Sequence, residues 1–250
     1  MLFLRSLLFN IAFYVALIAI MIAGIPAFFM TRFEVFVLAR RWARTSLWLL
    51  DKICGLKVEF RGLENIPQGG FVIAAKHQSI WETFALLLYF PDFSFVLKRE
   101  LVWLPMFGWY ARKGEQIAID RSKGASSLTQ VTQRTREFVA EGRQVFIFPE
   151  GTRRPPGAVP QYKLGVAHVC CETGARCLPV ALNSGLFWPR RSFLRKPGVV
   201  LVAFLPVIEP GRNKQAFLEV LRHQLEASTT ALIYEAVAKD PKLATAPSSD

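Results

Sequence analysis

The chain is 250 residues long, 52% of them hydrophobic, and carries a formal net charge of +12. This length suits one sizeable α/β core with an accessory segment and argues against two large independent domains. The charge suits an anionic membrane, phosphorylated substrates or nucleic acid, but no nucleic-acid-binding module is recognisable, so we predict no nucleic-acid partner.

The first expected element is an apolar helical segment over residues 7–30, which only Asn10 interrupts. It meets the ~20 residues that a membrane-spanning helix needs. Because no small-residue cleavage region follows, we favour a retained membrane anchor over a cleaved signal peptide. Pro26, near the end of the segment, leaves open a re-entrant hairpin that enters one leaflet.

Basic residues follow this segment, against Arg5 alone before it: Arg32, Arg40, Arg41, Arg44 and Lys52. By the positive-inside rule they place the remainder of the chain in the cytoplasm. Over residues 35–50 the arginines share one helical stripe and the apolar residues another, formed by Val35, Leu38, Trp42 and Leu49. Such a helix fits the headgroup layer of a membrane and fits packing on the domain equally well.

Beyond Gly55, short apolar runs alternate with helical patterns, which is typical of an α/β domain. We predict strands at residues 57–60, 71–75, 93–97, 116–119, 145–148, 177–182 and 199–204. We predict helices at residues 81–90, 126–141, 163–172 and 215–238. The chain then divides into an anchor with a basic interfacial helix (1–54), the α/β domain (55–238) and a tail (239–250). The tail is small, polar and proline-containing, so we predict that it is disordered.

The four cysteines, Cys54, Cys170, Cys171 and Cys177, form no C-x-x-C pair, and no histidines or acids stand near them at metal-ligand spacing. We therefore predict no metal site. The cysteines fit small buried apolar residues in a reducing compartment.

His77 stands just after the strand predicted at residues 71–75, where the chain turns into a helix. Sites of α/β proteins form at such strand ends. Glu82, five residues later, can reach one imidazole nitrogen and leave the other free to accept a proton. This is the base-plus-orienter arrangement of hydrolases and transferases, although the pair alone fits a structural histidine better.

A second group follows the strand predicted at residues 145–148, in the sequence Phe-Pro-Glu-Gly-Thr-Arg that ends at Arg153. Gly151 permits close backbone approach, while Thr152 and Arg153 supply donors for a phosphate or an oxyanion. Glu150 can hold an arginine or a ligand hydroxyl. The sequence alone fits a strand-terminating turn with a solvated arginine equally well.

Two further charged residues, Lys98 and Arg121, also stand at the ends of predicted strands. Each of them, taken singly, fits a solvated side chain. Together with Arg153 they place three cations at one edge of the sheet, which favours a phosphate site there.

These motifs resemble the four ordered blocks of the glycerolipid acyltransferases, and within that family the 1-acyl-sn-glycerol-3-phosphate acyltransferases. The blocks here are KHQSIWET (76–83), IAIDR (117–121), FPEGTR (148–153) and CLPVAL (177–182). An N-terminal membrane segment before the blocks is also usual in the family. The resemblance implies a single mixed-sheet acyltransferase domain with flanking helices over residues 55–238.

The activity that the resemblance implies is transfer of a fatty acyl group from an acyl thioester to the sn-2 hydroxyl of 1-acyl-glycerol-3-phosphate (lysophosphatidic acid), giving phosphatidic acid. No cofactor is implied; acyl-CoA or acyl-carrier protein is the donor. His77 would be the general base and Glu82 its orienting partner. Lys98, Arg121 and Arg153 would hold the acceptor phosphate. The remaining residues of the substrate site would be Glu150, Gly151, Thr152 and Pro179.

The chain departs from the family pattern at two positions. The family has an aspartate where Glu82 stands and commonly an asparagine where Lys76 stands. Glutamate keeps the charge and adds a methylene group to the reach of the side chain.

Two other functions stay open: an acyltransferase acting on another lyso-lipid, and a non-catalytic membrane protein that binds anionic lipids. The second accounts for the anchor and the net charge. It gives no reason for His77, Glu82 and the FPEGTR sequence to stand together at strand ends.

Overall fold

Seven strands form one mixed sheet in the part of the chain that the computed structural model describes, residues 1–244 without the side chain of Arg121. Their order is β1-β7-β6-β2-β5-β3-β4, and neighbours run parallel except for β6 and β7. The strands are β1 (Leu56–Arg61), β2 (Phe71–Ala75), β3 (Phe93–Lys98), β4 (Ile117–Ile119), β5 (Gln144–Ile147), β6 (Cys177–Leu182) and β7 (Gly198–Phe204). Each predicted strand is confirmed, with its ends shifted by no more than one residue.

The helices that flank the sheet are α1 (Leu2–Ala23), α2 (Arg32–Leu49), α3 (Glu82–Ala85), α4 (Phe107–Lys113), α5 (Gly124–Ala140), α6 (Gly165–Thr173) and α7 (Lys214–Lys239). The last three confirm predicted helices. The helix predicted over residues 81–90 is wrong in part, because α3 gives way to a 3-10 turn at Leu86–Tyr89. The sequence pattern missed α4, since seven residues that include Gly108 are too few to show a helical period.

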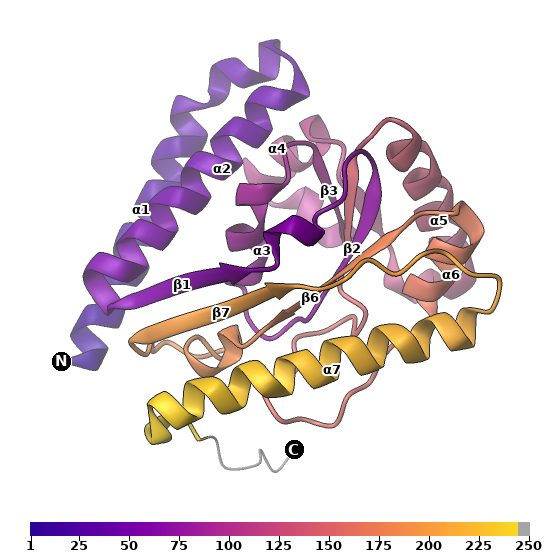
Figure 1. Ribbon diagram of the computed structural model, residues 1–250. Helices are drawn as coiled ribbons and strands as arrows, with labels where there is room; N and C mark the ends of the chain where they lie inside the picture. Colours follow the sequence, from indigo (N-terminus) through magenta and orange to yellow (C-terminus); the bar gives the residue numbers. More distant parts are fainter. Residues whose placement is uncertain (245–250) are drawn as a thin grey trace.

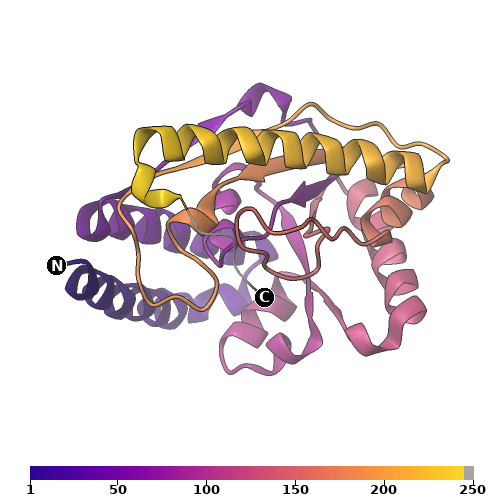
Figure 2. The same cartoon turned by 90° about the horizontal axis from the view of Figure 1, so that it is seen from below.

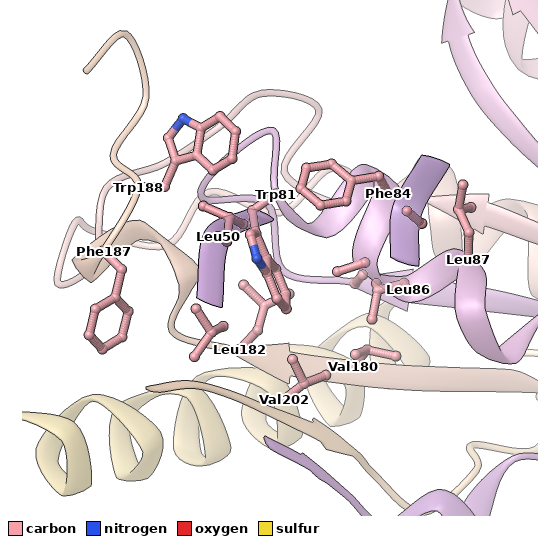
Figure 3. Close-up of a cluster of buried hydrophobic side chains, with 14 of the residues drawn as sticks. Leu50, Trp81, Phe84, Leu86, Leu87, Val180, Leu182, Phe187, Trp188 and Val202 are labelled. Atoms are coloured by element: carbon pink, nitrogen blue, oxygen red, sulfur yellow. The ribbon is translucent and has the colours of Figure 1, made fainter. Parts of the chain in front are cut away.

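Helices cover both faces of the sheet, so the domain has three layers (Figure 1, Figure 2). On one face α1, α2 and α3 share a hydrophobic core with the sheet, and Figure 3 shows Trp81, Leu50 and Leu182 within it. On the other face lie α5, α6 and α7. Burial of each large apolar side chain stabilises the fold by roughly 1.5–3 kcal/mol. β2 is buried along its whole length, so the residues directly after it have a fixed place.

The apolar segment predicted as one helical element over residues 7–30 is wrong in part, because it divides into α1 and a short 3-10 helix. α1 ends at Ala23, and a 3-10 turn at Ile25–Phe29, with Pro26 at its start, leads to α2. α1 and α2 lie side by side (Figure 1) and form a helical hairpin. Gly24 permits their close approach, because a Cβ atom there would lie 2.4 Å from the Leu38 side chain. Among the described helices, α1 is long and apolar enough to cross a membrane.

The basic helix predicted over residues 35–50 is α2. Val35 and Phe36 are buried, while Arg41 and Arg44 are exposed. Arg40 donates a hydrogen bond to the carbonyl oxygen of Pro91 at 2.9 Å. One face of α2 therefore packs on the domain, which was one of the two alternatives for this helix.

The predicted disordered tail is corrected at its beginning. Lys239 is the last residue of α7, and Pro241–Leu243 form a short 3-10 turn that buries Leu243 in the core. The rest of the prediction, for residues 245–250, lies outside the described residues.

Candidate functional site

His77 lies at the carboxyl end of β2, and its ring is held by Glu82, the first residue of α3. The distance between His77 Nδ1 and Glu82 Oε1 is 2.9 Å. A carboxylate only accepts hydrogen bonds, so Nδ1 carries the proton of this bond and Nε2 keeps its lone pair. The His77 side chain is 13% exposed and that of Glu82 is fully buried. The imidazole is therefore held by a carboxylate from the interior and keeps one nitrogen that Glu82 does not bind, the arrangement that a general base needs.

The Glu82 carboxylate has further donors that fix its orientation. Oε1 accepts hydrogen bonds from the backbone N–H groups of Gln78 and Ser79, each at 2.7 Å. Oε2 accepts one from the hydroxyl of Ser184, just beyond β6, at 2.8 Å. A buried carboxylate is tolerated when such donors replace water. The longer side chain of glutamate thus reaches His77 and the next strand together.

The FPEGTR segment packs against His77 from the neighbouring strand, β5. The ring of Phe148 stacks on the imidazole, with 4.0 Å between centroids and 18° between planes. The His77 backbone N–H lies 3.3 Å from Glu150 Oε2, and the backbone N–H of Arg154 donates to the His77 carbonyl oxygen at 2.8 Å. Both the ring and the backbone of His77 are therefore held by residues 148–154.

The turn itself requires its glycine. The backbone N–H of Gly151 donates to the carbonyl oxygen of Phe148 at 2.9 Å, and Gly151 has a φ of +66°. Glycine adopts this left-handed conformation without the penalty that a Cβ atom brings. The turn leaves Thr152 exposed and Arg153 partly exposed beyond the end of β5, where both can meet a ligand.

The other two cations follow strands farther along the same edge. Lys98, the last residue of β3, is exposed, and β3 lies two strands from β2. With strands ~4.8 Å apart, Lys98 starts ~10 Å from the end of β2, and Arg121, which follows β4, starts ~14 Å from it. The side chain of Arg121 is outside the described structure. Topology therefore brings Arg153, Lys98 and Arg121 to one edge in this order, with Arg153 nearest to His77.

Two predicted substrate contacts are corrected. Glu150 is buried, and its carboxylate binds Lys76 Nζ at 2.9 Å as well as the backbone of His77. Pro179 is buried within β6 opposite Ala74, and its carbonyl oxygen accepts a hydrogen bond from the backbone N–H of Leu205 at 2.9 Å. Neither residue presents a free group to a ligand, because one belongs to an internal ion pair and the other to the middle of the sheet.

Lys76 centres a network that the sequence did not reveal. Its Nζ lies 2.9 Å from Glu150 Oε1 and 2.8 Å from Glu226 Oε1 of α7. Glu226 Oε1 also accepts a hydrogen bond from the hydroxyl of Tyr162 at 2.6 Å. Burial raises the pKa of Glu150, and the charge of Lys76 opposes this. Burial and the bond to Glu226 raise the pKa of Tyr162.

Sequence signals for the missed residues differ in strength. Ser184 stands just beyond a predicted strand, the kind of place that held His77, so its position was a usable signal. Glu226 lies in the middle of a long helix, 150 residues from Lys76, so no local sequence pattern predicts their contact.

The described residues contain no group of three or more histidine, cysteine, aspartate or glutamate side chains placed to hold a metal ion. The four cysteines are free thiols, and Cys54, Cys170 and Cys177 are buried. A hydrogen bond with the Cys177 thiol, together with burial, raises the pKa of the Cys170 thiol. Cys54, Cys170 and Cys177 therefore lie in the interior, while Cys171 is partly exposed.

Relatives of known sequence match most of this chain. The profile of a family described as Acyltransferase matches residues 57–183. Over 182 residues the chain is 40% identical to the 1-acyl-sn-glycerol-3-phosphate acyltransferase of Pseudomonas aeruginosa, which covers 72% of this chain and 71% of the relative. Over 184 residues it is 30% identical to a chloroplastic 1-acyl-sn-glycerol-3-phosphate acyltransferase of Arabidopsis thaliana, covering 70% of this chain and 50% of the relative. The chain thus spans about half the length of the plant protein.

A solved structure has the same fold. The crystal structure of PlsC, the 1-acyl-sn-glycerophosphate acyltransferase of Thermotoga maritima, superposes with a TM-score of 0.78 at 22% identity, covering 93% of this chain and 98% of that one. Every site residue predicted from the sequence, from His77 to Pro179, lies inside the region that the family profile matches.

Proposed function

The chain belongs to the acyltransferase family, and we propose that it transfers a fatty acyl group from an acyl thioester to the sn-2 hydroxyl of 1-acyl-glycerol-3-phosphate, giving phosphatidic acid. The observation that carries this proposal is the contact between His77 Nδ1 and the buried Glu82, at 2.9 Å. It leaves His77 Nε2 as a base within the segment that matches the family. The acyl donor is acyl-CoA or acyl-carrier protein; the positive charge of the chain suits either acidic molecule.

In the proposed step, His77 Nε2 takes the proton of the acceptor hydroxyl as its oxygen attacks the thioester carbonyl carbon. The tetrahedral intermediate collapses, the carbon–sulfur bond breaks, and the imidazolium returns its proton to the leaving thiolate. Glu82 stabilises the imidazolium and holds the ring in the right tautomer. A positioned base contributes ~10²- to 10⁴-fold to the rate, and alignment of the two substrates adds to this.

The acceptor phosphate would lie along the sheet edge beyond β5, β3 and β4. Of the three predicted cations, Arg153 follows the strand nearest to His77, with Lys98 and Arg121 farther along. Guanidinium and ammonium groups bind phosphate oxygens through charge-assisted hydrogen bonds. This order supports a phosphate position to one side of His77, from which the glycerol hydroxyl can face the imidazole.

The apolar helix α1 associates the chain with a membrane, and the contacts of α1 with the domain favour insertion into one leaflet. Ser6 Oγ accepts a hydrogen bond from the backbone N–H of Arg195 at 2.9 Å, and the Tyr110 hydroxyl donates to the carbonyl oxygen of Met21 at 2.6 Å. These contacts stand ~22 Å apart along the helix. A spanning α1 would therefore draw the loop at Arg195 and the helix α4 into the hydrocarbon layer, where charged and polar groups are strongly disfavoured.

An apolar surface suited to this insertion runs from α1 to α4. Large apolar side chains exposed on α1 include Phe3, Leu4, Leu8, Ile11, Val15, Ile18 and Ile22. Those exposed just before and within α4 are Trp103, Leu104, Phe107 and Trp109. Tyr110 joins the two groups through its bond to Met21. Tryptophan is enriched where a protein enters the membrane interface, so we place this surface in the leaflet that supplies the lipid, on the cytoplasmic side.

The test is an activity matrix on purified protein reconstituted with lipid vesicles. Donors are acyl-CoA and acyl-carrier protein, and acceptors are lysophosphatidic acid, lysophosphatidylcholine and monoacylglycerol. We expect phosphatidic acid to form, with a kcat/KM for lysophosphatidic acid at least ~10-fold above the others. Its phosphate monoester offers more charged oxygens than the phosphodiester of lysophosphatidylcholine, monoacylglycerol offers none, and a charge-assisted contact adds ~1.5–3 kcal/mol. Vesicle binding without transfer to any acceptor would favour the non-catalytic lipid binder; preference for another lyso-lipid would change the acceptor.

A further inference from the structure

A lysine is buried directly beside the catalytic histidine. Lys76 is 5% exposed, and its Nζ contacts carboxylates from two different segments, Glu150 at 2.9 Å and Glu226 at 2.8 Å. Its Nζ also lies 5.4 Å from the centroid of the Tyr162 ring. One ammonium group thus joins the turn after β2, the segment after β5 and the middle of α7.

The charge of Lys76 bears directly on Glu150. The Glu150 side chain is fully buried, and a buried carboxylate without a partner takes up a proton instead of staying charged. Burial raises the pKa of Glu150, the nearby Glu226 adds to this, and Lys76 opposes both. Two further titratable groups lie near this pair: the Tyr162 ring faces Lys76 Nζ, and the end of the Lys163 side chain, its Nζ included, lies over Gly151, the residue after Glu150. Lys76 is the cation in direct contact with the Glu150 carboxylate.

Glu150 in turn bears on His77. Its Oε2 faces the backbone N–H of His77 at 3.3 Å, and the same segment supplies the Arg154 N–H that binds the His77 carbonyl oxygen. An ionised carboxylate is a stronger acceptor than a neutral carboxyl group, whose proton also needs a partner of its own. Loss of charge on Glu150 would therefore loosen the backbone that carries the base.

The network also closes the segment that surrounds the site. Residues 149–163 form a loop whose ends meet, because the backbone N–H of Lys163 donates to the carbonyl oxygen of Pro149 at 2.9 Å. Tyr162, next to this closure, donates to Glu226 on α7. Movement of α7 away from the sheet would break this bond and the Lys76–Glu226 pair together.

We propose that Lys76 is a positioning residue of the acyl-transfer site, whose ammonium group keeps Glu150 ionised against the His77 backbone and fastens this turn to α7 through Glu226. It acts through Glu150 and His77 and touches no substrate. The proposal rests on the proposed acyl transfer, and it assigns a function to the lysine that stands where the family commonly has asparagine.

The experiment compares Lys76→Met with wild type in steady-state transfer from acyl-CoA to lysophosphatidic acid, from pH 5 to 9. We expect kcat to fall by at least ~10-fold at pH 7, with KM for the acceptor changed less than ~3-fold. Without Lys76, Glu150 should hold its proton to higher pH, so the acidic limb of the kcat profile should move up by about 1–3 pH units. Lys76→Arg, which keeps the charge, should restore part of the rate and the original limb.

A matched control removes another lysine that pairs α7 with a glutamate. Lys214 Nζ lies 2.6 Å from Glu172 at the far end of the helix, so Lys214→Met deletes the same charge without touching the network. We expect wild-type kcat and pH profile from it. The double variant Lys76→Met/Glu226→Gln should lose less than the product of its single effects, because removing Glu226 eases ionisation of Glu150.

The outcomes separate this inference from the proposed function. Wild-type protein inactive with every donor and acceptor would overturn the function itself. Active wild type with an unchanged kcat and acidic limb in folded Lys76→Met would overturn the positioning role alone. If Lys76→Met does not fold, Glu226→Gln and Tyr162→Phe decide: we expect ~2- to 5-fold lower kcat from each, and wild-type kcat in both would overturn the proposal.

Discussion

One edge of the sheet carries two groups of candidate site residues that are built differently. Beyond β2 and β6, Glu82 is buried and meets His77 and Ser184 through short hydrogen bonds. Beyond β3, Lys98 is exposed at the strand end. The proposed base is thus held in place by the protein alone, while the proposed phosphate-binding cation is left in solvent. A base must keep its geometry through the reaction, whereas a phosphate arriving from a membrane meets a long, adaptable side chain at little structural cost.

The buried half of this comparison is tested by Glu82→Gln. We expect kcat to fall by about 10²- to 10⁴-fold, because an amide neither stabilises the imidazolium nor accepts from Gln78 and Ser79 as a carboxylate does. Steady-state kinetics with saturating lysophosphatidic acid measure it. Glu82→Asp keeps the charge but shortens the reach, so it should retain more activity than the glutamine variant. Equal loss in both would mean that size, and not charge, is what Glu82 contributes.

The exposed half is tested by Lys98→Ala. We expect KM for lysophosphatidic acid to rise by about 10-fold with kcat nearly unchanged, since an exposed phosphate contact is lost. The KM for an acceptor without phosphate should stay the same. Lys57, exposed on the far edge strand β1, offers the control Lys57→Ala, which should match wild type. A lower kcat with unchanged KM in Lys98→Ala would place Lys98 with the buried group instead.

An ion pair outside both groups shows the small effect that we expect from a charge remote from the site. Arg61 binds Glu235 of α7 through two hydrogen bonds, at 2.7 and 2.8 Å. These bonds, with one from Lys239, lower the pKa of Glu235 from 4.5 to about 2. Both side chains are about a third exposed, so Arg61→Gln should lower the free energy of unfolding by only about 0.2–1 kcal/mol and leave kcat unchanged.

The stabilisation by the Arg61–Glu235 pair should depend on pH in one direction. A carboxyl group whose pKa is lowered by folding stabilises the fold above its ordinary value and loses that effect as the pH falls through the folded value. The difference in Tm between wild type and Arg61→Gln should therefore be present at pH 7 and shrink between pH 4.5 and about 2. A difference that grows on acidification would contradict the assigned ion pair.

Local sequence patterns predicted the sheet well because its strands are short apolar runs with clear ends. They also placed His77 and Glu82, since the two residues stand five apart across one turn. The apolar segment at the N-terminus was harder: its composition gave an apolar helix, but the break at Gly24 depends on how closely α2 approaches α1. Composition carries no information about that packing.

The remaining site contacts were out of reach because they join residues distant in sequence. Glu150 was predicted to hold an arginine or a ligand hydroxyl, yet it is enclosed with Lys76. The asparagine that the family commonly has where Lys76 stands cannot supply that ammonium group. The contact between Lys76 and Glu226 becomes evident only from the packing of α7 on the sheet (Figure 1).

The most direct test of the account is the transfer rate of His77→Ala. The protein must keep the wild-type Tm and vesicle binding, and acyl transfer to lysophosphatidic acid is then measured with both substrates saturating. We expect a loss of about 10²- to 10⁴-fold in kcat, the contribution of a positioned base. A variant that folds, binds vesicles and transfers at nearly the wild-type rate would contradict His77 as the base.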